Sequence, residues 1–356
     1  MIIKTLLKEM MERRATDLHL TVGTPPVIRV DGELDRMEYD PLTAQDTQNL
    51  VYSLLKDEQK KRFELEKELD FAFGIKGLSR FRANVFLQRG CVACAIRSIP
   101  HEILGFEELG LPSVVSVLAE KRQGLILVTG PTGCGKSTTL ASIIRKINTS
   151  RHCHIITIED PIEYVHHHDK GIINQREIGQ DTTSFSNSLR YVLRQDPDVV
   201  LIGEMRDMET MQVALNIAET GHLTMATLHT NSTYESINRI IDSFPAQSQD
   251  QVRSQLSFVT LGVLTQQLVP KARGSGRVLC AEVLVCTPAV KATIRQDKLH
   301  QIYGMMQAGH KHGMQTMNQA LFNMVKKKEI TREVALERSN DAAELEQMVA
   351  TGRDIL

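Results

Sequence analysis

The segment GPTGCGKS, residues 130–137, carries three glycines, a lysine and a serine at the spacing G-x-x-x-x-G-K-[ST]. It follows the apolar run GLILVT and precedes a helix that we expect to begin at Lys136, the context in which this spacing forms a phosphate-binding loop. Glycines let the backbone direct N–H groups at phosphate oxygens, and a helix N-terminus attracts anions. We expect Lys136 to reach the β- and γ-phosphates and Ser137 to bind Mg²⁺. The residues predicted to contact the nucleotide are Gly130, Pro131, Thr132, Gly133, Cys134, Gly135, Lys136, Ser137 and Thr138.

Acidic residues follow two of the predicted strands. Asp160 and Glu163 come after the apolar run HIITI, and Glu204 comes directly after DVVLIG. Ligands of open parallel sheets bind at the carboxyl ends of the strands, so these carboxylates are expected to converge on one Mg²⁺–γ-phosphate site. Many P-loop ATPases carry an aspartate where this chain has Gly203. We therefore expect Glu163 to supply negative charge near Mg²⁺ and Glu204 to act as general base; the alternative is exposed strand-end charges without a catalytic role.

A histidine ends a third predicted strand, LTMATLH, and is followed by a threonine and an asparagine. A histidine at a strand tip can sense a γ-phosphate by hydrogen bonding. We expect His229 to do so, and the alternative is a structural or capping histidine.

The elements that must position these residues fall into two parts, as the length of 356 residues favours. Residues 1–100 have patterns of both strands and helices, which predict an α+β domain. Residues 101–118 have the proline and glycine content of a linker. From residue 119 onward strands alternate with helices, among them helices near 184–194 and 208–219, which predicts a mostly parallel sheet covered on both faces. From residue 288 to the end the pattern is helical. The fold class is therefore α/β.

Composition excludes some classes of protein. Lys+Arg 42 against Asp+Glu 43 and an aromatic content of 4% disfavour a nucleic-acid motor, so we expect no nucleic-acid partner. No apolar run approaches the roughly 18 residues of a membrane span. The six cysteines are interpreted as free thiols, and we expect a cytoplasmic protein.

The segments GPTGCGKSTTLAS, IEDPIE and QREIGQDTTSFSNSLRYVLRQDPDVVLIGEMRDMETMQVALNIAETGHLTMATLHTN resemble the ATPase superfamily of type II secretion, type IV secretion and type IV pili. Within it the chain resembles the pilus retraction ATPases of the PilT group, over essentially its whole length. The resemblance implies a ring homohexamer whose subunits have a PAS-like N-terminal domain and a RecA-like ATPase domain. It also implies ATP and Mg²⁺ as ligands. Its four motifs correspond to Walker A at 130–137, an Asp box at 158–163, a Walker B with glycine before glutamate at 199–204 and a His box at 221–229. Glu204 then matches the catalytic glutamate, Glu163 a residue implicated in positioning Mg²⁺ and water, and His229 a residue near the γ-phosphate.

The resemblance further implies arginines of the N-terminal domain at the subunit interface. Arg82 and Arg97 are our candidates, with Arg80 a weaker third, and their alternative is solvent-facing strand arginines. Arg277, in RGSGRVLC, is a candidate for phosphate sensing.

Retraction is favoured over assembly because the stretch LTQQLVPKARGSGRVLCAEVLV lacks the four-cysteine zinc module that assembly and type II secretion motors usually carry. The helix AVKATIRQ, residues 289–296, resembles the retraction-motor pattern A-I-R-N-L-I-R-E but departs from it, notably at Gln296. The implied partners are an inner-membrane platform protein and, indirectly, pilin, with the ATPase peripheral to the membrane. The alternatives are an accessory retraction motor, another secretion-superfamily ATPase and a low-turnover nucleotide switch.

Overall fold

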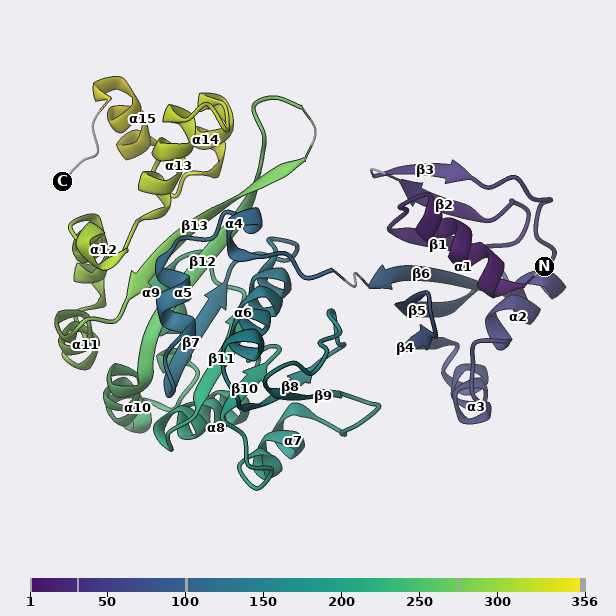
Figure 1. Cartoon of the computed structure of the whole chain (residues 1–356), viewed down its shortest axis with the longest axis horizontal. Coiled ribbons are helices and arrows are strands. Elements are labelled where there is room, and N and C mark those ends of the chain that lie inside the picture. The colour runs from purple at the N-terminus through teal and green to yellow at the C-terminus, as the bar shows by residue number, and fades with distance from the viewer. Residues whose placement is uncertain (1, 31, 100–101, 275, 353–356) are drawn as a thin grey trace. The chain divides into compact units, whose positions relative to one another are not determined.

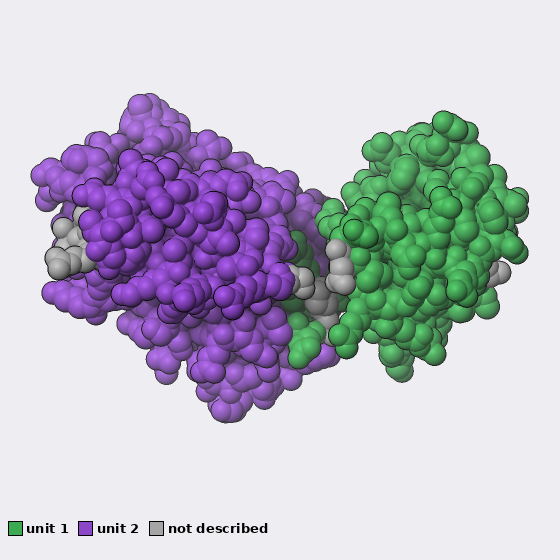
Figure 2. Space-filling model, turned by 90° about the horizontal axis from the view of Figure 1, so that it is seen from above, with its two compact units in different colours: residues 1–102, 163–165 green, residues 103–162, 166–356 purple. Residues whose placement is uncertain are grey.

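The structure is a computed structural model that describes residues 2–30, 32–99, 102–274 and 276–352. The chain divides into two compact units, which Figure 2 distinguishes by colour. The first is Met1–Glu102 with Glu163–Val165, and the second is Ile103–Ile162 with His166–Leu356. Residues 100–101, at the predicted domain boundary, lie outside the described residues.

The first unit is built on a six-stranded antiparallel sheet (Figure 1) with the strand order β3-β2-β1-β6-β5-β4. In β5, Phe81, Ala83 and Val85 are buried and Arg82 is exposed, as the alternation predicts. Three helices contribute to the core on the buried face. The elements are α1 (Ile3–Glu12), β1 (Asp17–Leu20), β2 (Val27–Val30), β3 (Glu33–Arg36), α2 (Ala44–Tyr52), α3 (Asp57–Glu66), β4 (Glu68–Ile75), β5 (Ser79–Gln88) and β6 (Cys91–Ile99).

The second unit contains a seven-stranded sheet of order β13-β12-β7-β11-β10-β8-β9. All neighbouring strands are parallel except β12 and β13, which form an antiparallel pair at one edge. The α/β class predicted from the sequence is confirmed. The strands are β7 (Gly124–Thr129), β8 (His154–Glu159), β9 (Ile172–Glu177), β10 (Val199–Ile202), β11 (Leu223–Leu228), β12 (Thr260–Pro270) and β13 (Arg277–Val285).

Helices cover both faces of this sheet. One apolar cluster joins the strands to α5 and α6, and another joins their opposite face to α7, α8, α9, α10, α11 and α12. The predicted helix start at Lys136 and the helices near 184–194 and 208–219 are confirmed. The helices are α4 (Phe106–Leu109), α5 (Val114–Ala119), α6 (Lys136–Ser150), α7 (Phe185–Val192), α8 (Met208–Glu219), α9 (Thr233–Asp242), α10 (Ala246–Val259), α11 (Pro288–Arg295), α12 (Ile302–Gln307), α13 (Met317–Lys326), α14 (Arg332–Arg338) and α15 (Ala342–Thr351).

The stretch 101–118, predicted as a linker, is structured where it is described. It contains α4 and most of α5, and Val115 and Leu118 are buried against the second sheet. Gly110, one of the glycines of this stretch, is the C-cap residue of α4 and has a left-handed conformation, with φ of 67°.

At the other end of the unit, α13, α14 and α15 share an apolar cluster with Val269 of β12 and Cys280 of β13. Buried Glu282 of β13 accepts hydrogen bonds from the first N–H groups of two helices, Thr233 of α9 at 2.6 Å and Met317 of α13 at 3.3 Å. The β12–β13 pair therefore joins the sheet to the C-terminal helices.

None of the described helices is both long enough and apolar enough to cross a membrane.

Candidate active site

The loop between β7 and α6 has the backbone of a phosphate cradle. Gly130, Gly133 and Gly135 have φ of 134°, 77° and 90°, and Gly135 is the N-cap residue of α6. These left-handed conformations favour glycine and turn successive N–H groups toward a common anion position. The Nζ of Lys136, the first residue of α6, donates to the carbonyl oxygens of Gly130 at 2.8 Å and Pro131 at 3.1 Å.

Gln266 of β12 supports this loop from behind, a role that the sequence analysis missed. It is 0% exposed; its Nε2 donates to the Cys134 carbonyl at 2.8 Å and its Oε1 accepts from Thr139 Oγ1 at 3.0 Å. A Cβ at Gly130 would lie 2.3 Å from the Gln266 carbonyl oxygen, so only glycine permits this approach of loop and strand. No motif spacing marks this glutamine, because its partners are set by the register of β12 on β7.

The glycine before Glu204 also has a packing reason. A Cβ built on Gly203 would lie 3.2 Å from both the Glu159 Cα and the Ile158 carbonyl oxygen, and the Gly203 N–H donates to that oxygen at 2.8 Å. The end of β10 therefore lies too close to β8 for a larger residue to fit without a shift.

Two of the predicted catalytic residues, Glu204 and His229, lie in one chain of contacts with the predicted phosphate-binding Lys136 at the strand tips. Glu204 Oε1 lies 3.2 Å from His229 Nε2, and His229 Nδ1 lies 3.5 Å from Lys136 Nζ. The other oxygen of Glu204 contacts Arg206, with Oε2 to Nη2 at 2.8 Å. β10 and β11 are neighbours, and β11 also pairs with β7, which ends at the phosphate loop. The sheet order thus brings Lys136, His229 and Glu204 together, as the rule for strand ends predicts.

The environment keeps Glu204 ionised. Burial alone would raise the pKa of its carboxyl group, but the hydrogen bond and charge of Arg206, together with His229, lower the pKa below its usual range. The carboxylate is therefore able to accept a proton at neutral pH.

A line of hydroxyl groups connects the segment after His229 to the phosphate loop. Thr230 Oγ1 and Ser236 Oγ are 2.6 Å apart, Ser236 donates to Thr129 Oγ1 at 3.3 Å, and Thr129 and Thr265 hydroxyls are 2.7 Å apart. Thr129 is the last residue of β7 and Thr265 lies opposite it on β12. These contacts tie β7 to β12 directly and tie β7 to the segment after β11 through Ser236 of α9, so polar contacts as well as the sheet hold the surroundings of the site.

The other predicted residues are not brought to this cluster within the described second unit. Glu163 is exposed and belongs to the segment that groups with the first unit. Arg82 and Arg97 are also in the first unit, where Arg97 Nε contacts Asp17 Oδ1 at 2.8 Å and Arg82 Nη2 lies 4.0 Å from Asp70 Oδ2. Arg277 begins β13 opposite Pro270, on the part of the hairpin that extends past the pairing of β12 with β7.

The site suits a nucleotide with Mg²⁺. In the described part of the chain no group of three His, Cys, Asp or Glu side chains could hold a metal ion alone. Mg²⁺ bound with nucleotides needs few protein ligands, since phosphates and waters fill most positions. Ser137, the second residue of α6, follows Lys136 at the mouth of the cradle and has the donor type required.

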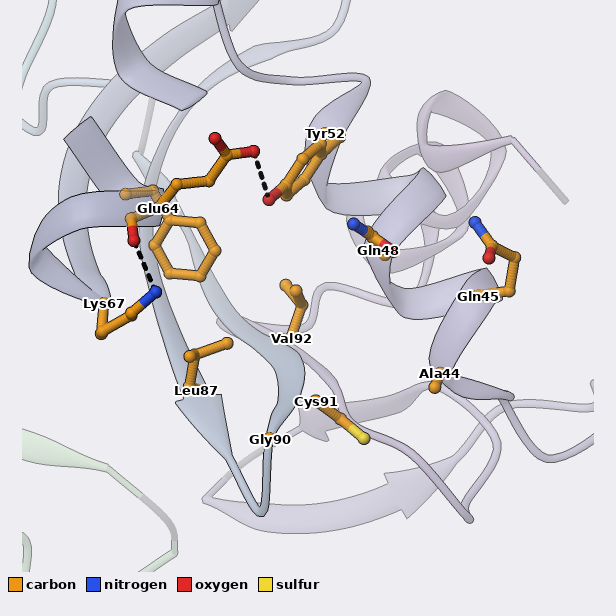
Figure 3. A pocket seen from close by; sticks show the side chains of 11 residues that line it. Ala44, Gln45, Gln48, Tyr52, Glu64, Lys67, Leu87, Gly90, Cys91 and Val92 are labelled. Carbon is orange, nitrogen blue, oxygen red and sulfur yellow. Dashed lines mark hydrogen bonds between the residues drawn. The ribbon is translucent and has the colours of Figure 1, made fainter. Parts of the chain in front are cut away.

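A cavity of about 250 Å³ lies elsewhere, in the first unit (Figure 3). It is formed by α2, α3 and the turn between β5 and β6, with Tyr52 bonded to Glu64 at its edge. None of the predicted site residues lines it.

The chain is similar to known proteins over nearly its whole length. A family model described as "Type II/IV secretion system protein" matches residues 1–354. The chain is 46% identical over 337 residues to the type IV pilus retraction ATPase PilT of Pseudomonas aeruginosa, covering 95% of this chain and 98% of that protein. It is 41% identical over 349 residues to the type IV pilus ATPase PilU of the same species, covering 98% and 91%. A crystal structure of the pilus retraction motor PilT with bound ADP has a TM-score of 0.93 and 51% identity, covering 98% of this chain and 100% of that chain.

Proposed function

We propose a mechanism of ATP hydrolysis for this chain on the premise that it belongs to the type II/IV secretion system protein family. Within that family it belongs to the PilT family of type IV pilus retraction ATPases. It is an ATPase, and its function is pilus retraction in twitching motility. The observation that carries the mechanism is the chain of contacts from Lys136 through His229 to Glu204. Contacts that bring a lysine ammonium and an ionised carboxylate together support a site in which the first binds phosphate and the second accepts a proton.

In the proposed reaction, the backbone N–H groups of residues 130–137 and the Lys136 ammonium bind the phosphates. Glu204 accepts a proton from water as the water oxygen attacks the γ-phosphorus and the bond to the bridging oxygen of ADP breaks. His229 orients Glu204 and contacts the γ-phosphate. Ser137 would hold Mg²⁺, for which the sequence also predicts Glu163 as a ligand, and the ion would offset charge on the β- and γ-phosphates.

We assign the remaining arginines to a subunit interface. Arg82 and Arg97 of the first unit, and Arg277 of the second, would stabilise phosphate charge in a homohexameric ring. Such a ring, working in the cytoplasm and peripheral to the inner membrane, would act on a membrane platform protein and, through it, on pilin. Exposed arginines on a unit that lacks the phosphate loop support this assignment for Arg82 and Arg97.

The test is a count of surface pili by electron microscopy on cells that lack the chain and on cells that carry Glu204→Gln. We expect excess pili and lost twitching in both, because a retraction motor without its general base cannot withdraw pili. Steady-state turnover of the purified Glu204→Gln variant should fall by at least about 100-fold. Cells without pili in both cases would mean that the chain drives assembly, and wild-type protein with negligible turnover would indicate a nucleotide switch.

A second candidate function is that of an accessory retraction motor, because Pseudomonas aeruginosa has two type IV pilus ATPases, PilT and PilU, that are both similar to this chain. It predicts that cells lacking only this chain still retract pili, whereas the proposed function predicts that they do not.

A further inference from the structure

Glu204 is held from both sides. His229 Nε2 lies 3.2 Å from one oxygen of its carboxylate, and Arg206 Nη2 lies 2.8 Å from the other. The Glu204 side chain is 20% exposed and the Arg206 side chain is 64% exposed, so the arginine reaches inward from the surface to a half-buried carboxylate. Neither the phosphate-loop motif nor the assigned catalytic set gives Arg206 a role.

The backbone that carries Arg206 is fixed at both ends. Before it, Met205 is buried and its N–H donates to the Thr227 carbonyl of β11 at 3.1 Å. After it, Asp207 is the N-cap of α8 and accepts from the Thr210 N–H at 2.8 Å. The contact between Arg206 and Glu204 is therefore set by strand β10, its neighbour β11 and a capped helix.

We propose that Arg206 is a positioning residue for ATP hydrolysis, fixing the carboxylate of Glu204 in the orientation in which it accepts the proton of the attacking water. The inference rests on the proposed role of Glu204 as general base. A carboxylate has about four lone-pair sites, so contacts with Arg206 and His229 leave sites for a water molecule. The planar guanidinium restricts carboxylate rotation better than a lysine ammonium, because its donors have a fixed geometry.

Charges around the carboxylate support this role. Arg206 and His229 face Glu204 directly, Lys136 lies behind His229, and the charge of Asp160 stabilises the Arg206 guanidinium. Arg206 helps to keep the pKa of Glu204 low against the effect of burial. Removal of the arginine should therefore raise the pKa of Glu204 and move the acid limb of the pH–rate profile to higher pH.

A structural role predicts a different outcome. An ion pair with an arginine this exposed adds little to stability, so its loss should scarcely change the thermal unfolding midpoint. The chain offers a matched control in Arg190 of α7, which is 66% exposed and contacts Glu209 at 2.6 Å, since neither residue belongs to the contacts of Glu204.

The experiment compares kcat, KM for ATP, the pH–rate profile and the thermal unfolding midpoint of the full-length wild type, Arg206→Ala, Arg206→Lys, Arg190→Ala and Glu204→Gln. For Arg206→Ala we expect kcat to fall about 10- to 100-fold, as for a misplaced catalytic group, with KM within about twofold of wild type. The acid limb should move to higher pH and the unfolding midpoint should stay unchanged. Arg206→Lys should recover part of kcat, and Arg190→Ala should match wild type throughout.

Wild-type kcat and an unmoved acid limb in Arg206→Ala would overturn the inference, as would a loss of kcat that parallels a loss of thermal stability. Retained turnover in Glu204→Gln would instead overturn the assignment of the general base, and with it the premise. The two failures are thus distinguishable.

Discussion

Gly203 stands where many P-loop ATPases have an aspartate. The contacts of its backbone give a packing explanation for the glycine. Its Cα faces the backbone of β8, and a Cβ would lie 3.2 Å from Glu159 Cα and from the Ile158 carbonyl oxygen. The glycine therefore has a packing reason of its own, because any larger residue here would need β8 to shift by a few tenths of an ångström.

Restoring the usual aspartate should harm this protein. We expect Gly203→Asp to lower the free energy of unfolding by about 1–3 kcal/mol, the usual range for overpacking, and to lower turnover. Gly74→Asp is the control, since a Cβ at that strand glycine meets nothing within 4 Å. Urea unfolding of both variants measures the difference, and a Gly203→Asp protein as stable as wild type with higher turnover would contradict the packing explanation.

Residue types and spacing predicted only part of this site. Lys136, Glu204 and His229 were identified because each ends or follows a strand within a recognisable motif. Gln266 and Arg206 were missed because a glutamine inside a strand and an arginine before a helix have no distinctive spacing. Gln266 matters through a partner distant in the sequence, Cys134. Arg206 matters because the fold of its turn directs the guanidinium onto the carboxylate of nearby Glu204, and the sequence alone does not indicate that contact.

Among the elements, β12 most directly governs the phosphate loop, because Gln266 links the strand to Cys134 and Thr139. Gln266→Leu would leave a buried carbonyl and a buried hydroxyl without this partner, at a cost of about 1–3 kcal/mol for each group. We expect a looser loop, with a raised Kd for fluorescent ADP and a raised KM for ATP.

Gln267→Leu is the matched control, since the neighbouring side chain points to the Arg338 carbonyl at 3.4 Å instead. Its nucleotide affinity should equal that of wild type. Equal ADP affinity in Gln266→Leu and Gln267→Leu would show that β12 does not set the loop geometry.

At this scale the alternation of strands and helices predicted the parallel strands, but no pattern indicated β12 and β13. Their stretch LTQQLVPKARGSGRVLCAEVLV was interpreted only by its lack of cysteines. Polar residues such as Thr265 and Gln266 weaken its apolar pattern, yet both are buried because their side chains bond to β7 and the phosphate loop. Long-range pairing of this kind is decided by tertiary structure and not by local preference.

In the whole molecule, the phosphate loop belongs to one unit and Arg82 and Arg97 belong to the other. The main question is therefore which subunit supplies an arginine to a given phosphate site. The resemblance to secretion ATPases predicted the fold and function, and the comparisons confirm both. The sequence of one chain does not encode in any motif which subunit supplies an arginine, because that depends on how copies assemble.

Mixing two inactive variants tests whether Arg82 acts on a neighbouring subunit of the proposed ring. We expect Arg82→Ala to lower turnover more than nucleotide affinity, because a cation at the γ-phosphate acts mainly in the transition state. Glu204→Gln should also be inactive. If Arg82 acts on a neighbouring subunit, an equal mixture assembled into hexamers regains about a quarter of wild-type turnover, since that share of interfaces joins an intact Glu204 to an intact Arg82. An arginine acting within its own subunit gives no recovery, because every chain in the mixture then carries a defective site. Turnover of the mixture, measured against each variant alone and against the double variant Arg82→Ala/Glu204→Gln, therefore separates a shared site from a self-contained one.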